Sequence, residues 1–273
     1  NDHIKEEDLK AKILLRDGFF ARPAMMTGDI VAMKELYNEK GYNRVEITSR
    51  STPVPGENMV HVTYVVKEGK KVKIRNIDFL GNGAIESKRF RKAIESHEDH
   101  WWSGGEYKPK VLDEDLAKIE TLYRNEGYLD ARAAVMRIDE INEGSHVDIY
   151  VKIDEGRRYY AGDIAWSGNV VVEDGDIEKL IKLKKGDPFS LESIEMMQMS
   201  INSVYWEKGY IWSRIRPKQN IRKQKIDLDL EIIENNPASI NEIKISGNTK
   251  TFETVIRREL DVYPGDRFIL GDV

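Results

Sequence analysis

The sequence contains no cysteine among its 273 residues. This absence excludes structural disulfides, zinc sites built on thiolates and cysteine nucleophiles. No apolar run reaches the ~18 residues of a membrane-spanning helix, and no secretory signal is recognisable at the N-terminus. The phosphate-binding loop, the dinucleotide fingerprint and the hydrolase nucleophile elbow are also missing. We therefore expect neither an enzyme built on one of these sites nor a cofactor.

The chain also lacks a strong charge of either sign. It has 43 Lys and Arg against 48 Asp and Glu, which gives a net charge of −5. A nucleic-acid-binding domain shows a concentrated basic face, whereas the cations of this chain are interpreted as scattered. We therefore expect no nucleic acid among its partners.

Candidate metal ligands are few. His97 and His100 are separated by two residues, so they lack the i, i+4 histidines and the general base of zinc-protease helices, and no third ligand is evident. We therefore expect no metal site. Asp113, Glu114 and Asp115 begin a predicted helix, where carboxylates interact favourably with the helix dipole. That structural role explains them better than acid–base catalysis.

What the chain does contain is a repeated helix, and its clearest copy lies in residues 111–128. Four side chains recur there at i, i+4, i+7 and i+11: Leu112, Leu116, Ile119 and Tyr123. This stripe predicts an amphipathic helix that ends before Gly127. The same helix, again followed by Gly-Tyr, occurs 86 residues earlier and 82 residues later. Its stripes there are Met26, Ile30, Met33 and Tyr37, and Ile194, Gln198, Ile201 and Tyr205. The chain is therefore a tandem array of one domain.

Three strands accompany the helices of each repeat. The first ends in a Gly-Asn turn and is predicted at residues 77–82, 164–169 and 243–248. The second follows the Gly-Tyr pair and alternates weakly. The third alternates strictly over residues 60–66, 147–153 and 226–232, which indicates one buried and one solvated face.

The order strand–helix–helix–strand–strand predicts an α+β fold of tandem two-layer sandwiches, each with two helices on a three-stranded mixed sheet. We expect the third strand to be central and the other two to be edges. The predicted domains are residues 1–69, which lack the first strand, the complete repeats 70–156 and 157–235, and the N-terminal part of another repeat in 236–273. We expect the chain to be a fragment of a longer protein.

This repeat resembles the POTRA domains of the BamA family of outer-membrane protein assembly factors, and the resemblance covers essentially the whole chain. Two segments carry it furthest. One runs from His100-Trp101-Trp102-Ser103 through residues 115–122 to Gly127-Tyr128, and the other is residues 243–247 followed by 257–260. The resemblance implies POTRA repeats two to five. Gln198 on an apolar stripe departs from the pattern and puts the packing of that helix in question.

The resemblance implies a periplasmic binding scaffold of the outer-membrane β-barrel assembly machinery, with no catalytic activity. Its implied partners are unfolded outer-membrane protein precursors, accessory lipoproteins and a C-terminal membrane β-barrel of the same full-length protein. An alternative is the periplasmic POTRA arm of a related transporter, of the autotransporter-assembly or two-partner-secretion type.

The candidate binding site is the exposed edge of the second strand, because an extended partner segment can pair with its free N–H and C=O groups. The candidate residues in the second repeat are Leu129, Ala131, Arg132, Ala133, Ala134 and Val135. Those in the third repeat are Ile211, Arg214 and Ile215, where Arg214, Arg216 and Pro217 are expected to block the edge. The alternative is an idle edge that its neighbours protect.

A second candidate is the Trp101-Trp102 pair, which lies where the repeats differ in length. Tryptophan is enriched at interface hot spots, so the pair is a possible partner anchor. The alternative is that the pair folds back over the helices as a local core.

Overall fold

The computed structural model describes residues 3–100 and 104–269. By its internal contacts the chain forms two compact units. One consists of Asn1–Leu122 with Ala131–Glu155, and the other of Tyr123–Asp130 with Gly156–Val273. The last turn of one long helix therefore belongs with the unit that follows it.

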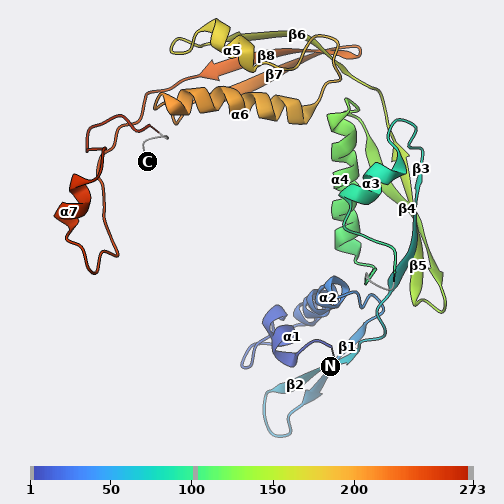
Figure 1. Ribbon diagram of the computed structural model, residues 1–273. Coiled ribbons are helices and arrows are strands. Elements are labelled where there is room, and N and C mark those ends of the chain that lie inside the picture. Colours follow the sequence, from blue (N-terminus) through green and yellow to red (C-terminus); the bar gives the residue numbers. More distant parts are fainter. Residues whose placement is uncertain (1–2, 101–103, 270–273) are drawn as a thin grey trace. The chain divides into compact units, whose positions relative to one another are not determined.

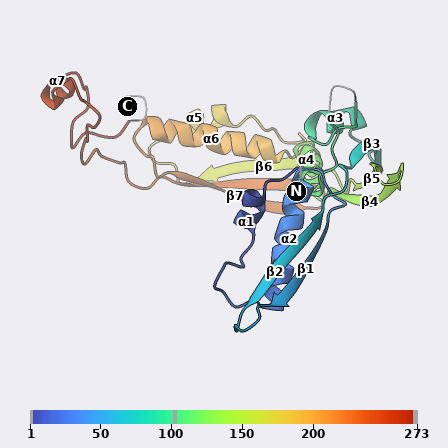
Figure 2. The same ribbon diagram turned by 90° about the horizontal axis from the view of Figure 1, so that it is seen from below.

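The first repeat has two helices and a two-stranded antiparallel sheet (Figures 1 and 2). Its elements are α1 (Glu6–Lys12), α2 (Pro23–Glu39), β1 (Glu46–Pro53) and β2 (Val60–Lys67). Met33, Tyr37 and Ile47 are buried in its core together with Leu9 of α1. The periodic side chains of α2 therefore face the sheet, as the sequence predicts.

The second and third repeats share one architecture. The second contains β3 (Lys73–Leu80), α3 (Ser87–Ala93), α4 (Pro109–Asn125), β4 (Arg132–Ile141) and β5 (His146–Asp154). The third contains β6 (Tyr160–Ser167), α5 (Asp174–Leu180), α6 (Leu191–Glu207), β7 (Arg214–Arg222) and β8 (Lys225–Ile233). In Figure 2, α5 and α6 lie on the same side of their sheet. The predicted α+β fold is confirmed.

The sheet orders are β3-β5-β4 and β6-β8-β7. In each sheet the central strand pairs in parallel with the first strand of the repeat and antiparallel with the second. The prediction that the third strand is central is therefore confirmed. Its alternation has the expected cause, because Val147, Ile149, Val151 and Ile153 of β5 are all buried while Lys152 between them is exposed. The second strands, β4 and β7, each have a neighbour on one side only.

The Gly-Asn turn after the first strand depends on close approach of the backbone. Gly81 has φ +89°, and a Cβ there would lie 2.3 Å from the carbonyl oxygen of Ile153. Gly168 has φ +92°, and its Cβ would lie 2.2 Å from the carbonyl oxygen of Ile232. Side chains rarely adopt this φ and cannot occupy this space. Only glycine therefore fits both turns.

In each of the first two repeats, a buried aspartate of the second helix binds the backbone that follows the first helix. Asp29 of α2 accepts hydrogen bonds from the backbone N–H groups of Leu14 and Leu15, at 2.6 and 3.3 Å. Asp115 of α4 accepts them from Glu95 and Ser96, at 2.8 and 2.7 Å. Both aspartates are almost fully buried.

The prediction that Asp115 serves the start of a helix is wrong. The helix α4 begins earlier, at Pro109, so Asp115 lies in its second turn and faces inward. Burial pushes the pKa of Asp115 upward, but the N–H groups of Glu95 and Ser96 and the Lys118 ammonium favour the carboxylate, and the net result is a lowered pKa. The third repeat has Met197 at this position, buried in its apolar core.

Gln198, which interrupts the apolar stripe of α6, has a specific partner. It is half-buried, and its amide donates a hydrogen bond of 2.8 Å to the carbonyl oxygen of Ile215 in β7. The polar group is therefore satisfied, and α6 packs through Ile194, Ile201 and Tyr205 as the other helices do.

A backbone hydrogen bond recurs where each repeat follows the last. The carbonyl of Gly41 accepts from the N–H of Val72 at 3.0 Å, and that of Gly209 accepts from Ala238 at 2.9 Å. Within the second unit, the carbonyl of Gly127 likewise accepts from Tyr159 at 2.8 Å. The glycine of every Gly-Tyr pair therefore also bonds the chain that begins the next repeat.

The C-terminal part contains α7 (Glu253–Arg258). The strand predicted at residues 243–247 is not formed there, so that prediction is wrong. A first strand pairs in parallel with the third strand in both complete repeats, and the described residues after α7 contain no strand. The alternating pattern is present, but the described residues offer no third strand for it to pair with.

Candidate edge-strand binding surface

The candidate edge of the second repeat is β4, and its bounds differ from the prediction. The strand begins at Arg132 and extends to Ile141, so Leu129 and Ala131 lie before it. Ala131 is fully buried, and Leu129 is half-buried against the apolar core of the second unit. A bulge between Val135 and Arg137 shifts the register. The bulge breaks the alternation of residues 136–141, which is why the sequence pattern ended too early.

The N-terminal end of this edge is already occupied. The backbone N–H of Ala133 donates to the Glu120 carboxylate of α4 at 3.2 Å, so this N–H points away from the neighbouring strand. Every second residue of a strand directs its N–H to the same side, so Val135 also directs its N–H outward. Within the described parts of the chain, no side chain bonds the β4 backbone beyond Ala133. The open part of the edge therefore runs from Val135 to Ile141.

The side chains along β4 offer little obstruction. Arg132 and Ala134 are exposed, and Met136 at the bulge is 58% exposed. Ala133 and Val135 are half-buried on the opposite face. The guanidinium of Arg137 lies over the ring of Tyr150 at 4.0 Å, which keeps that cation against its own sheet. An extended segment thus meets small or flexible apolar side chains at residues 134–136 and exposed charged ones at Arg137, Asp139 and Glu140, where Arg137 also pairs with Asp139 at 3.3 Å.

The free edge of the third repeat is β7, which extends from Arg214 to Arg222. Ile211 precedes the strand and is half-buried, and Ile215 is buried in the core, so neither offers a side chain to a partner at the edge. Arg214 is exposed. Pro217 lies opposite Leu230 in the ladder. Proline is compatible with a paired strand where its nitrogen faces away from the partner, so the outward edge lacks a donor at this position.

The two edges correspond residue by residue as far as Val135 and Pro217. Val135 pairs with Val151 of its central strand, and Pro217 pairs with Leu230 of the other. In the same register, Ala134 corresponds to Arg216. Beyond this point β4 has Met136 as the extra residue of its bulge, so the position of Lys218 in the ladder is taken by Arg137. The hydrogen bonds agree with this alignment, because Ala133 bonds Glu120 and its equivalent Ile215 bonds Gln198.

The sequence interpretation missed a basic segment at this second edge. Residues 214–225 include six cations and no acidic residue: Arg214, Arg216, Lys218, Arg222, Lys223 and Lys225. Cations are therefore not scattered here, although the net charge of the whole chain hides the concentration. A charge count over short windows would have found the segment.

The two other predicted features contribute less. Trp101 and Trp102 lie outside the described residues. Close to them, Asp99 binds the Lys73 ammonium at 3.0 Å. In residues 3–100 and 104–269, no three His, Asp or Glu side chains converge as metal ligands would.

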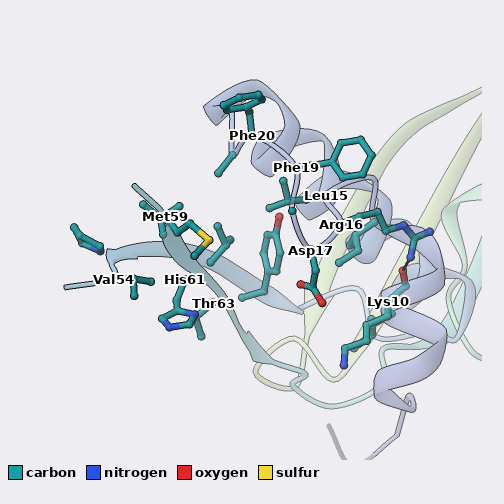
Figure 3. A pocket seen from close by; sticks show the side chains of 18 of the residues that line it. Lys10, Leu15, Arg16, Asp17, Phe19, Phe20, Val54, Met59, His61 and Thr63 are labelled. Atoms are coloured by element: carbon teal, nitrogen blue, oxygen red, sulfur yellow. Dashed lines mark hydrogen bonds between the residues drawn. The ribbon is translucent and has the colours of Figure 1, made fainter. Parts of the chain in front are cut away.

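A cavity of about 1280 Å³ opens beside β2 in the first repeat (Figure 3). It is lined by Leu9 and Ile13 of the α1 segment, by Phe19 and Phe20, and by Met59 before the strand. The strand β2 has β1 on one side only, whereas the third strands of the next two repeats are flanked on both sides. The cavity therefore lies beside the edge of β2 at which, in the two complete repeats, the first strand pairs with the third. No ligand is proposed for it.

The POTRA family model, described as "Surface antigen variable number repeat", matches residues 1–69, 72–156 and 159–235. The chain belongs to the POTRA family. None of the helices in the described POTRA repeats has the length and hydrophobicity needed to cross a membrane.

The POTRA repeats of this chain are similar to those of BamA proteins. The outer membrane protein assembly factor BamA of Neisseria meningitidis serogroup B is 27% identical over 267 residues, covering 95% of this chain and 33% of that protein. BamA of Nitratidesulfovibrio vulgaris is 26% identical over 278 residues, covering 98% and 35%. This chain therefore spans about a third of the length of these curated relatives.

The POTRA fold is also found in a solved structure. The crystal structure of Haemophilus influenzae BamA POTRA3-5 matches with a TM-score of 0.56 and 20% identity, covering 74% of this chain and 81% of that one. This similarity concerns the fold alone.

Proposed function

We propose that this POTRA array is a periplasmic arm that takes part in outer-membrane protein assembly, and that it binds extended client segments along the edge of β4. The similarity to BamA proteins over nearly the whole chain supports the first part. The proposed partners are unfolded outer-membrane protein precursors and accessory lipoproteins. We propose no catalytic role.

The observation that carries the proposed mechanism is the open edge from Val135 to Ile141. Proteins usually protect such edges with proline, charge or a covering segment. The first part of β4 is covered by Glu120. The second part has no proline and an exposed Met136, and its exposed charges, Arg137, Asp139 and Glu140, are of both signs. Added strands gain their affinity from main-chain hydrogen bonds, so a binding edge needs free backbone rather than a deep pocket.

The expected affinity is low. A client that forms about five ladder hydrogen bonds, each worth ~0.5–1.5 kcal/mol net, gains only a few kcal/mol beyond the cost of ordering its own chain. A dissociation constant in the micromolar range or weaker follows. Weak binding that tolerates different sequences suits the release of a client to a later step.

The test is to close the edge of β4 with a change that the fold accepts. Val135→Pro removes one outward N–H, and the third repeat already holds a proline at this position. The 273-residue chain and the variant are titrated with a fluorescent ten-residue peptide of alternating valine and threonine. We expect affinity to fall at least about tenfold while the circular dichroism spectrum stays unchanged. Equal binding by a folded variant would remove the edge of β4 from the proposal.

A control variant separates the edge from the surface in general. Val170→Asp changes a side chain that is 88% exposed on the loop after β6, outside β4 and β7. It should leave peptide binding unchanged. Loss of binding in this variant would indicate nonspecific hydrophobic association instead of strand pairing.

A further inference from the structure

The edge of the third repeat carries a row of cations on one face. Arg214, Arg216 and Lys218 alternate along β7, and all three are exposed. Side chains at i, i+2 and i+4 of a strand stand on the same face about 7 Å apart. The row continues around the hairpin through Arg222, Lys223 and Lys225 without an acidic residue.

Of the three alternating cations on β7, two have no ion-pair partner within the described chain. The acidic residues of the neighbouring strand β8 take others: Lys218 pairs with Glu231 at 3.2 Å, and Arg222 pairs with Asp227 at 3.5 Å. Arg214 and Arg216 make no side-chain hydrogen bond or ion pair with any described residue. Their guanidinium groups are therefore available to a carboxylate from outside.

The backbone of β7 offers less than its side chains. The carbonyl of Ile215 accepts the amide of Gln198 at 2.8 Å, and Pro217 has no N–H. These two outward positions lie in the first half of the strand, beside Arg214 and Arg216. A neutral strand would find an interrupted ladder there, so recognition must come from charge.

We propose that the face of β7 binds an extended acidic segment of a protein partner, with carboxylates at alternate residues facing Arg214 and Arg216. An extended segment with acids at every second residue repeats at the same spacing as the row. An extended segment laid along β7 is one strand wide and can stay over the cations, whereas a planar anionic surface would also cover Asp227, Asp229 and Glu231 of β8 and be repelled by them. This site is separate from the edge of β4 and does not depend on client binding there.

Protection of the edge against aggregation is the competing explanation, since charge and proline on edge strands serve that purpose. Protection requires no partner and no order among the charges. The two explanations therefore differ in whether an acidic segment binds, and in whether its binding depends on Arg214 and Arg216 in particular.

The probe is a fluorescent ten-residue peptide of alternating glutamate and threonine, titrated into the 273-residue chain at low and at physiological salt. Matched peptides carry lysine or glutamine in place of glutamate. We expect the glutamate peptide alone to bind, and its affinity to fall as salt rises because exposed charges are screened. Failure of the glutamate peptide to bind, or equal binding of the lysine peptide, overturns the proposal.

The decisive variant is Arg214→Glu with Arg216→Glu, which should weaken binding of the glutamate peptide at least about tenfold. Lys182→Glu with Lys208→Glu changes the net charge equally at exposed positions outside β7 and should bind almost as the parent does. If the glutamate substitutions prevent folding, Arg214→Gln with Arg216→Gln replaces them. Equal loss in both pairs would show a net-charge effect and overturn the proposal.

A final arm distinguishes the source of the negative charge. Vesicles of phosphatidylglycerol and phosphatidylcholine are sedimented with the parent chain and the Arg214→Glu, Arg216→Glu variant. We expect weaker capture by vesicles than by the immobilised glutamate peptide. Vesicle binding that requires the two arginines, in the absence of peptide binding, overturns the protein-segment proposal in favour of a lipid surface.

Discussion

The second strands of two neighbouring repeats, β4 and β7, occupy the same place in the same sheet and differ in what they present. At two successive positions, Ala134 and Val135 in β4 correspond to Arg216 and Pro217 in β7, and β4 then inserts Met136 as a bulge where β7 continues with Lys218. The first strand has open backbone beyond Ala133 and presents apolar side chains as far as Met136, whereas the second has interrupted backbone and cations. The cores beneath them are alike, so a few edge residues are sufficient to give two copies of one fold different partners.

The largest effect is expected at a feature that both sheets share. Gly81→Ala and Gly168→Ala each force a Cβ to within 2.3 Å of a carbonyl oxygen and require a strained φ, so each should cost its repeat about 3 kcal/mol or more. Hydrogen exchange of the β5 and β8 amides measures the two costs separately. Similar losses of stability would show that the two sheets are equivalent and that the repeats differ at their edges. A loss in one repeat only would show that the two sheets are not equivalent.

The buried carboxylate of Asp115 is a feature of the second repeat that the third repeat lacks. Asp115→Asn replaces an acceptor by a group that also carries N–H donors, which face the N–H groups of Glu95 and Ser96. We expect the second repeat to lose about 2 kcal/mol at neutral pH, measured by exchange of the α3 and α4 amides. The third repeat, which has Met197 instead, should be unaffected.

The same carboxylate predicts a pH dependence. The pKa of Asp115 is lowered in the folded chain, so its stabilising contribution is complete above the unfolded pKa of about 3.9 and is lost as pH falls through the lower folded pKa. Stability of the second repeat should therefore decline below pH 4 more in the parent than in Asp115→Asn. Parallel pH profiles for the two proteins would contradict this account.

Exchange of the edge residues sharpens the comparison directly. Pro217→Val restores an outward N–H to β7, and together with Arg216→Ala and Lys218→Met it gives β7 the side chains of residues 134–136, without the bulge of β4. We expect this triple variant to gain measurable binding of the valine–threonine peptide, by about tenfold over the parent β7 edge in a chain that also carries Val135→Pro. No gain in a folded variant would mean that the β4 edge needs more than these three positions.

The smallest effect is expected at the hydrogen bond between α6 and β7. Gln198→Leu leaves the carbonyl of Ile215 without its side-chain donor, so the loss should be about 1 kcal/mol. Exchange of the α6 and β7 amides measures it. A loss of stability as large as that of Asp115→Asn would show that this hydrogen bond stabilises its repeat as much as the buried carboxylate does.

Much of the fold follows from periodicity. The stripe of α4 and the alternation of β5 reflect burial against one neighbour, which a sequence records at spacings of about 3.6 and 2 residues. The bounds of β4 did not follow, because the bulge at Met136 ends the alternation while the ladder to β5 continues. The strand at residues 243–247 also failed, since pairing is a property of two strands.

The candidate site was predictable in kind but not in detail. The order of the strands identified the second strand as an edge, but nothing in the sequence showed that Glu120 binds the N–H of Ala133. The buried role of Asp115 was visible only as its alignment with Asp29, 86 residues earlier. The basic run at residues 214–225 was in plain view, and averaging charge over the whole chain hid it.

The hydrogen bond from Tyr159 to the carbonyl of Gly127 has a consequence for anyone who builds chimeras of such arrays. The end of α4 is held by the residues that begin the next sandwich, so a graft that stops at Asn125 or at Glu155 separates a donor from its acceptor. The smallest transplantable piece is thus one sandwich together with the Gly-Tyr of its predecessor, and hybrid proteins joined elsewhere should fold less cooperatively at the seam.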